Sequence, residues 1–182
     1  NRGHSHPFHG SGHLWHAHPE LELTLITRGT GTRFIGDNIA RFHADDLVLI
    51  GSGLPHYWHG LRAYSGQAIQ FSLDATHPLH ALAEIHDLHP LCEEAERGVQ
   101  FSGGTARRAR KLMLSMPDRG GVERFARFML VLEALAEAPE EERMQLSRQT
   151  FSRLGDSSTS SGIQKAVAFV VSRFRGDVRL DD

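Results

Sequence analysis

Cysteine is almost absent from this 182-residue chain, which contains only Cys92. A single cysteine excludes an internal disulfide, so we expect a protein of a reducing compartment, the cytoplasm. We see no signal peptide and no apolar run long enough to span a membrane, and we predict no membrane partner. Excess charge is missing too, because the formal net charge is −2 at pH 7. That balance is unlike the basic charge of a free-standing nucleic-acid-binding protein.

The first part of the chain has the pattern of β-strands. Leu21, Leu23 and Leu25 alternate with polar residues, and glycine-containing turns separate short apolar runs. Many short strands with such turns indicate an antiparallel sandwich or barrel. Residues 1–13 are rich in glycine, histidine and serine, and we predict a loop or arm there. Strands are predicted from about residue 14 to residue 73, including 32–35, 39–42, 47–50 and 63–73.

After residue 77 the apolar period changes from two to about 3.6, which indicates helices. The strongest prediction is a helix at 122–138, where five apolar residues share one face. We expect this helix to form a homodimer, since such a face needs covering. The five residues are Phe125, Phe128, Met129, Leu132 and Leu135. Further helices are predicted at 79–85, 91–97, 105–116 and 163–174, with a short extended piece at 99–101.

His16, His18 and Glu22 form the most informative group of polar residues. On one strand, their even numbering would place all three side chains on one face. His56, which follows Gly-Ser-Gly-Leu-Pro, is the remaining residue that looks like a partner. Three imidazoles and a carboxylate suit a divalent transition metal such as Zn, Ni, Mn or Fe. The alternative is a polar effector pocket that works without a metal.

The stretch from Gly10 to Gly29 resembles the first motif of the cupin superfamily. Its order is glycine, five residues, His-x-His, three residues, Glu, six residues and glycine. The second cupin motif is degenerate here, because its proline, leading glycine and asparagine are all replaced. Gly53 and His56 still match it, so its ligand position is retained. This resemblance implies a cupin-type, jelly-roll-like barrel with His16, His18, Glu22 and His56 as the ligand set.

A longer pattern resembles the sensor domains of AraC-family bacterial transcription regulators. It includes residues 15–23, Asp46-Leu-Val-Leu-Ile50 and Leu54-Pro-His56, followed by residues 94–102 and two helices. Residues 163–181 resemble the opening of that family's DNA-binding domain. The resemblance implies an effector-sensing barrel, a dimerising helical segment and a truncated C-terminal domain with two helix-turn-helix motifs. Such motifs place recognition helices in the major groove of DNA.

These observations divide the chain into four parts. We expect a cupin effector- or metal-binding barrel at 1–76 and a helical dimerisation segment at 77–138. Residues 139–162 are predicted to be a linker, acidic at the start and rich in serine and glycine at the end. Residues 163–182 are expected to begin the truncated helix-turn-helix domain. DNA would be bound only through that domain.

Several residues near the motif are candidates for an effector pocket. Trp15, Tyr57 and Trp58 would stack on a sugar or another planar effector, or pack in the core or at its rim. Arg33 and Gln70 would also reach the pocket if the strand register allows it. We therefore predict a small-molecule effector, sugar-like in character.

The second function class is a metal-dependent cupin enzyme, a dioxygenase or isomerase. No general base stands out beyond the ligand set, so we predict no catalytic residue and no enzyme activity. Cys92 is expected to be an inert helix residue, and the basic run at 107–111 a solvated helix face. The histidines of the first 13 residues are expected to belong to the arm.

Overall fold

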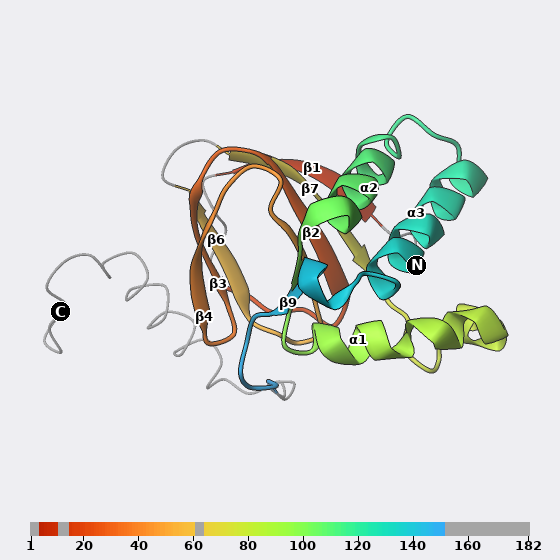
Figure 1. The fold of residues 1–182 in the computed structure, drawn as a ribbon. Coiled ribbons are helices and arrows are strands. Elements are labelled where there is room, and N and C mark those ends of the chain that lie inside the picture. Colours follow the sequence, from red (N-terminus) through yellow and green to blue (C-terminus); the bar gives the residue numbers. More distant parts are fainter. Residues whose placement is uncertain (1–3, 11–14, 61–63, 152–182) are drawn as a thin grey trace, which may run out of the picture.

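The computed structural model describes residues 4–10, 15–60 and 64–151. Two antiparallel sheets and a group of helices form three layers, with the larger sheet in the middle (Figure 1). The larger sheet has the strand order β1-β7-β2-β5-β8-β9, and the smaller sheet has the order β4-β3-β6. The strands are β1 (His4–Gly10), β2 (Leu21–Arg28), β3 (Gly31–Ile35), β4 (Asn38–Phe42), β5 (Leu47–Ile50), β6 (His56–Gly60), β7 (Tyr64–Phe71), β8 (Val99–Phe101) and β9 (Arg143–Gln145).

The larger sheet is buried on both faces. Leu21, Leu23 and Leu25 of β2 face the helices and join one apolar cluster. Ile26 of β2 and Val48 of β5 belong to a second cluster between the two sheets. Burial of both faces explains why β5 is apolar at every position, where a one-sided strand would alternate. Even-numbered positions of β2, Glu22 among them, therefore face the smaller sheet.

The helices are α1 (His89–Ala95), α2 (Gly103–Leu114) and α3 (Gly121–Ala136), with short 3-10 turns η1 (Pro78–Ala81), η2 (Ala83–Leu88) and η3 (Glu140–Glu142). The helices predicted at 91–97, 105–116 and 122–138 are confirmed within two residues at each end. The helix predicted at 79–85 is wrong in type. Its residues form η1 and η2, because the His77 side chain caps Leu79 N and Leu82 is extended between the two turns.

The prediction of a loop or arm over residues 1–13 is also wrong in part. Residues 4–10 form β1, which pairs antiparallel with β7 along its whole length. The strand lies at the edge of the larger sheet, where a sequence containing proline and glycine is tolerated. The sequence hides this strand because neither the β-branched residues nor the alternation of a typical strand is present.

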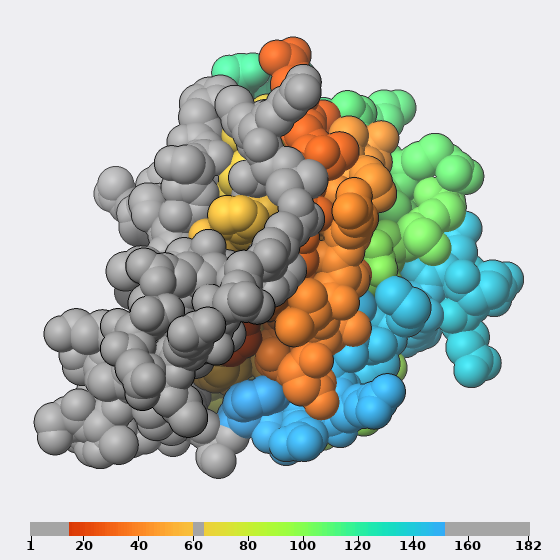
Figure 2. All heavy atoms as spheres, turned by 90° about the vertical axis from the view of Figure 1, so that its left-hand side faces the viewer, coloured from red at the N-terminus to blue at the C-terminus, as the bar shows by residue number. Residues whose placement is uncertain are grey.

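The first part of the expected linker does not run as free chain. Residues 143–145 form β9, which pairs with β8, and Leu146 and Ser147 are buried. The Ser147 hydroxyl donates to Asp37 Oδ1 at 2.8 Å, so the segment also touches the β3–β4 turn. Figure 2 shows this segment (blue) beside the β3–β4 hairpin (orange). The predicted helix at 163–174 and the domain at 163–182 lie outside the described residues.

The mainly β fold followed by helices is confirmed. The expected barrel, however, does not close, since the hydrogen-bonded ladders of the described residues leave two separate sheets. One isolated bridge, from His16 to His56, pairs the segment before β2 with β6 of the smaller sheet. Across the described ranges, every helix is too short or too polar to cross a bilayer.

Candidate functional site

The bridge between His16 and His56 brings two distant parts of the chain together. His56 N donates to His16 O at 2.9 Å, and His16 N donates to His56 O at 3.2 Å. Beside this bridge, Gly53 N donates to His18 O at 2.8 Å. The loop before β6 is thereby fixed against the segment before β2. His16 and His18 precede β2, so the single strand predicted for His16, His18 and Glu22 is wrong, although their proximity is not.

Three imidazole rings meet at this point, those of His16, His18 and His56. The ring centroids are 4.3 Å apart for His16 and His56, 5.0 Å for His18 and His56, and 5.8 Å for His16 and His18. One nitrogen from each ring lies within 4.8 Å of the other two. Among the described residues, no other group of three histidine, cysteine or acidic side chains meets this distance.

Backbone carbonyl groups orient two of the rings. His56 Nδ1 lies 2.8 Å from Leu54 O, and His18 Nδ1 lies 3.0 Å from Glu20 O. Because a carbonyl oxygen only accepts, each Nδ1 carries the proton and donates it, which leaves Nε2 facing the group. Histidines that bind metals have this arrangement, with the outer nitrogen held by a backbone partner. His56 Nε2 is buried without a hydrogen-bond partner, as expected of a ligand atom.

Glu22 adds a negative charge to the histidine triad. Its Oε2 lies 3.1 Å from His18 Nε2 and accepts from Gln70 Nε2 at 2.9 Å, and its Oε1 accepts from Thr24 Oγ1 at 2.6 Å. His56 Nε2 is 3.9 Å from Oε1. Burial raises the pKa of Glu22, but these hydrogen bonds and the positive charge that His56 gains at low pH outweigh it and bring the pKa to about 2. Glu22 is therefore a carboxylate at neutral pH.

The histidines respond to the same surroundings. Burial lowers the pKa of His56 to about 4, so this ring is neutral and can donate a lone pair. Burial also lowers the pKa of His18, but the hydrogen bond and charge of Glu22 outweigh it and raise the pKa above its usual value. The neutral His56 ring offers a nitrogen lone pair directly, and a metal ion would displace the proton that His18 Nε2 shares with Glu22, so that both partners become donors. The donor set thus fits a divalent transition ion.

The five predicted effector-pocket residues are placed differently from one another. Gln70 binds Glu22, and Trp58 lies with its ring 5.8 Å from the His56 ring, so both adjoin the triad. Trp15 is half-buried next to His16. Tyr57 points to the other face of β6, where its hydroxyl is 3.2 Å from His59 Nδ1. The placement of Tyr57 therefore does not support a pocket role at the triad.

Arg33 is buried between the sheets, but its side chain is already bound. The guanidinium is 1% exposed and donates to Asp46 Oδ1 at 2.5 Å and to Gln100 Oε1 at 2.9 Å. Arg33 Nε, Asp46 Oδ2 and Trp58 Nε1 nevertheless remain buried without hydrogen-bond partners. Together with His56 Nε2, these atoms make the space between the sheets unusually polar for a protein interior.

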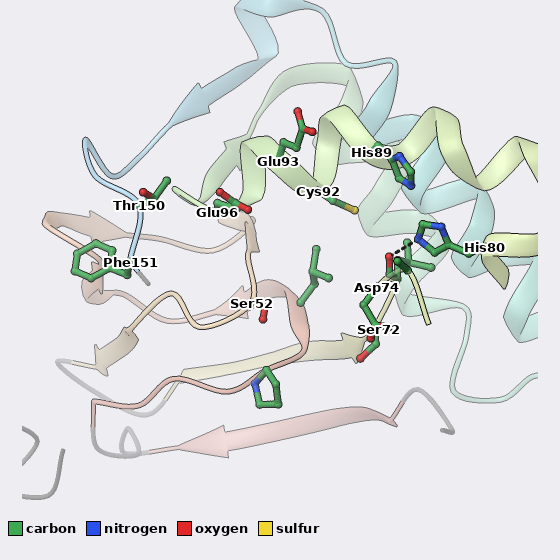
Figure 3. A pocket seen from close by; sticks show the side chains of 14 residues that line it. Ser52, Ser72, Asp74, His80, His89, Cys92, Glu93, Glu96, Thr150 and Phe151 are labelled. Carbon is green, nitrogen blue, oxygen red and sulfur yellow. Dashed lines mark hydrogen bonds between the residues drawn. The ribbon is translucent and has the colours of Figure 1, made fainter. Parts of the chain in front are cut away.

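A pocket of about 650 Å³ lies on the other side of the larger sheet, against α1 (Figure 3). It is lined by Leu21 and the segment after β7, residues 72–75, by His80, His89 and Cys92, and by Thr150 and Phe151. None of the predictions from the sequence pointed to this pocket. Its walls come from segments far apart in the chain, and only the histidine-rich stretch near residue 80 gave a signal that could have pointed to it.

A family model described as the AraC-like ligand binding domain matches residues 2–166. The solved AraC-like transcriptional activator CuxR is 10% identical, with a TM-score of 0.47 over 89% of this chain and 54% of CuxR. ToxT from Vibrio cholerae is 10% identical, with a TM-score of 0.46 over 98% of this chain and 68% of ToxT. Oxalate decarboxylase from Bacillus subtilis, studied for its Mn(II) centres, is 22% identical, with a TM-score of 0.35 over 44% of this chain and 27% of that enzyme. No curated protein sequence matches the chain.

Proposed function

Because the chain belongs to the AraC-like ligand-binding domain family, we propose that it senses an effector between its two sheets and thereby controls DNA binding. The observation that carries the proposal is the histidine triad with Glu22, in an interior that holds further buried polar atoms without partners. Such groups require a polar occupant. The effector favours one arrangement of sensor, dimer and a C-terminal helix-turn-helix domain, by population shift. We also propose that the protein acts in the cytoplasm.

A divalent ion is the first candidate occupant. His16, His18 and His56 would hold it through nitrogen atoms, with Glu22 supplying the carboxylate oxygen, and Zn, Ni, Mn or Fe all suit this set. When bound, the ion would supply a Lewis-acid centre. The chain's own contribution is orientation, since Leu54 O and Glu20 O fix two of the rings.

The organic effector is proposed to be small, polar and sugar-like. Next to the triad, Trp58 offers an aromatic ring and Gln70 an amide group, and both are typical of sites that bind hydroxyl-rich ligands. Gln70 already donates to the Glu22 carboxylate, so an incoming hydroxyl group would join an existing hydrogen-bond network. The same network serves the alternative in which the pocket works without a metal.

A metal-dependent cupin enzyme remains the second candidate, favoured by the same donor set. Acid–base catalysis by an enzyme of this kind would need a general base outside the ligand set. Glu22 lies against His18 and His56 and is proposed as a ligand, so it is not such a base. We therefore propose a sensor without catalytic residues. Turnover of a candidate substrate by the Fe(II)- or Mn(II)-loaded protein would favour the enzyme.

Zinc binding tests the interior site. We expect His16→Gln and His56→Gln each to weaken Zn²⁺ binding at the triad at least about 100-fold, since removal of a ligand costs more than removal of an outer-shell partner. Isothermal titration with Zn²⁺, with elemental analysis of protein without a purification tag, gives the affinity and the stoichiometry. His59→Gln is the matched control, because His59 lies on the same strand as His56 and points the other way, towards Tyr57.

The parent protein and the His59→Gln variant should then each bind one more equivalent of Zn²⁺ than the His16→Gln and His56→Gln variants. Near-ultraviolet circular dichroism checks that the variants are folded. If all four proteins bind zinc equally, the triad is not a metal site, and the interior is assigned to an organic effector alone.

The N-terminal half of α3 is proposed as the homodimer interface. Val122 is 86% exposed and Phe125 is 45% exposed, whereas Leu132 and Leu135 are buried against the sheet. The predicted apolar face thus splits into a buried half and an exposed half. Large exposed apolar residues on one helix are typical of a surface that another chain covers.

Phe125→Gln is expected to weaken a dimer at least about tenfold in its dissociation constant, as loss of a central aromatic residue does. Sedimentation equilibrium or light scattering over a concentration series measures this change. Arg124→Gln, the neighbouring position on another side of α3, should leave association unchanged. A parent protein that stays monomeric at every concentration would rule out this interface.

A further inference from the structure

A second group of histidines lies outside the space between the sheets. The stretch from residue 77 to residue 89 contains four histidines, and the rings of His80, His86 and His89 contact one another. Their centroids are 4.9 Å apart for His80 and His89, 5.2 Å for His86 and His89, and 5.7 Å for His80 and His86. These rings come from η1, η2 and α1, so three consecutive elements meet at the cluster.

The ring centroids are spaced as they would be around a tetrahedral ion, although no three donor atoms of this group lie within 4.8 Å of one another. A nitrogen ligand about 2 Å from a tetrahedral ion places the centroids of neighbouring imidazoles about 5 Å apart. The distances of 4.9–5.7 Å in this cluster agree with that value as well as those of the interior triad, 4.3–5.8 Å. The planes of the three rings differ by only 29–43°. Binding would therefore require the rings to rotate about Cβ–Cγ until their nitrogens converge, as those of the interior triad already do.

Two of these rings already have the backbone partner that metal-binding histidines use. His80 Nε2 donates to Leu73 O at 2.8 Å, and His86 Nε2 donates to His80 O at 3.1 Å. Because each Nε2 carries the proton, each Nδ1 carries the lone pair. This is the arrangement of His18 and His56 with the two nitrogens exchanged. Rotation of the two rings towards a metal would move Nε2 as well, so these backbone hydrogen bonds would have to lengthen or exchange as Nδ1 binds.

Cys92 supplies a fourth donor. His89 and Cys92 are three residues apart on α1, so they share one side of the helix. Both line the pocket together with His80, and Figure 3 shows the Cys92 sulfur directed to the side where the two rings lie. Burial and the nearby Glu93 raise the pKa of the thiol to about 11, so without a metal it is protonated at neutral pH.

We propose that His80, His86, His89 and Cys92 form a second divalent-metal site, with three nitrogen donors and one sulfur donor, at the pocket beside α1. A thiolate with imidazoles selects borderline-soft ions such as Zn²⁺ and Co²⁺. On binding, the Cys92 thiol releases its proton to solvent and a sulfur–metal bond forms, with no change of oxidation state. The site does not depend on the function proposed for the interior triad.

The proposed site lies on the helix that contacts β9, near the end of the described chain. Two residues after Cys92 on α1, Glu94 binds the Arg143 guanidinium at 3.1 Å, and Gln145 Nε2 donates to Glu94 O at 2.7 Å. Both partners belong to β9, and the chain continues from there to Thr150 in the wall of the same pocket. An ion that joins η1, η2 and α1 would therefore stiffen the helix that holds β9.

Cobalt spectroscopy tests the proposal directly. Cys92 is the sole cysteine of the chain, so a thiolate-to-Co²⁺ charge-transfer band in the near ultraviolet can come from this site alone. The interior triad has no sulfur donor and cannot produce the band. We expect the parent protein to develop the band with one equivalent of Co²⁺, Cys92→Ser to lose it, and His89→Asn and His80→Asn to weaken its formation at least about tenfold. His59→Gln should keep the band unchanged.

A second measurement needs no substitution. Zn²⁺ should slow the alkylation of Cys92 in the parent protein at least about tenfold, because a metal-bound thiolate is shielded. Absence of the band while Co²⁺ binds elsewhere, an unchanged alkylation rate with Zn²⁺, or a band that survives both histidine substitutions would each overturn the proposal. Loss of zinc at the interior triad would leave the cobalt band in place, so failure of one site is distinguishable from failure of the other.

Discussion

Asp46→Ala is expected to lower the free energy of unfolding by about 3–5 kcal/mol, because it leaves a buried charge without its partner. Arg33 is 1% exposed and Asp46 is 7% exposed, and they lie between the two sheets. Their charges are satisfied mainly by each other, through Arg33 Nη1 and Asp46 Oδ1. Removing the carboxylate leaves the guanidinium in a medium of low dielectric constant, where an unpaired charge is strongly unfavourable.

Gln100 completes this buried network and limits what can replace Asp46. Its Nε2 donates to Asp46 Oδ1 at 2.7 Å, and its Oε1 accepts from Arg33 Nη2 at 2.9 Å. The three side chains come from β3, from the residue before β5 and from β8, so the network joins the smaller sheet to the larger one. After Asp46→Ala, the amide of Gln100 has also lost one acceptor. The unpaired guanidinium and the lost acceptor both lower the free energy of unfolding.

The neighbouring residue provides a matched control. Asp45 pairs with Arg110 at 2.7 Å, but both side chains are exposed, at 64% and 42%. Asp45 has a φ of +69°, a conformation that asparagine tolerates. Asp45→Asn should therefore change the free energy of unfolding by less than about 1 kcal/mol. Urea unfolding of the parent protein, Asp46→Ala and Asp45→Asn measures both changes, provided that the dependence of the free energy on urea concentration is the same for all three. Equal losses of stability in the two variants would contradict the role given to burial.

The double variant Arg33→Met/Asp46→Leu separates the buried charge from the shape of the site. Replacing both partners by apolar residues of similar size removes the unpaired charge, so much of the lost stability should return. A double variant as unstable as Asp46→Ala would show that packing around the two side chains, and not charge, dominates the cost.

The sequence predicted that His16, His18, Glu22 and His56 lie close together, although one step of the reasoning was wrong. The spacing of His16, His18 and Glu22 indicated a shared strand face, yet the histidines precede β2. They meet because the chain before β2 pairs with the start of β6 at His56. A motif thus identifies which residues converge, while the backbone that brings them together depends on long-range pairing.

Other features could not be predicted because their partners are far apart in the chain. Arg33 was a candidate for the effector pocket, and its partners Asp46 and Gln100 are 13 and 67 positions away. The strand β9 has three residues and forms by pairing with β8, so its own sequence carries almost no strand signal. By contrast, the apolar run at 47–50 predicted β5 with its observed bounds. A strand that is buried on both faces has apolar residues at consecutive positions, and that pattern is visible in the sequence.

Gly51→Ala is expected to lower the free energy of unfolding by about 3 kcal/mol, at the upper end of the cost of overpacking. Gly51 lies at the end of β5, where its N–H donates to Ala95 O at 2.7 Å. A Cβ at this position would lie 2.5 Å from Ala95 O and 2.7 Å from Glu96 Cα. These atoms belong to the backbone at the end of α1, so rotation of a side chain cannot relieve the clash.

The same substitution should weaken zinc binding at the interior triad. Gly51 O accepts from Leu54 N at 3.2 Å, and Leu54 O in turn orients the His56 ring. A shift of this loop would turn His56 away from His16 and His18. We expect the Zn²⁺ affinity to fall about 10–100-fold, the range seen when an outer-shell partner is lost.

Gly121→Ala is the control for the glycine effect. Gly121 is the first residue of α3, and nothing lies within 4 Å of an added Cβ. Alanine there should stabilise the protein by about 0.5–1 kcal/mol by restricting the unfolded chain, and should leave zinc binding unchanged. Thermal or urea unfolding gives the first value and calorimetric titration gives the second. If Gly51→Ala behaved like Gly121→Ala, close contact between the β5–β6 loop and α1 would not be what positions His56.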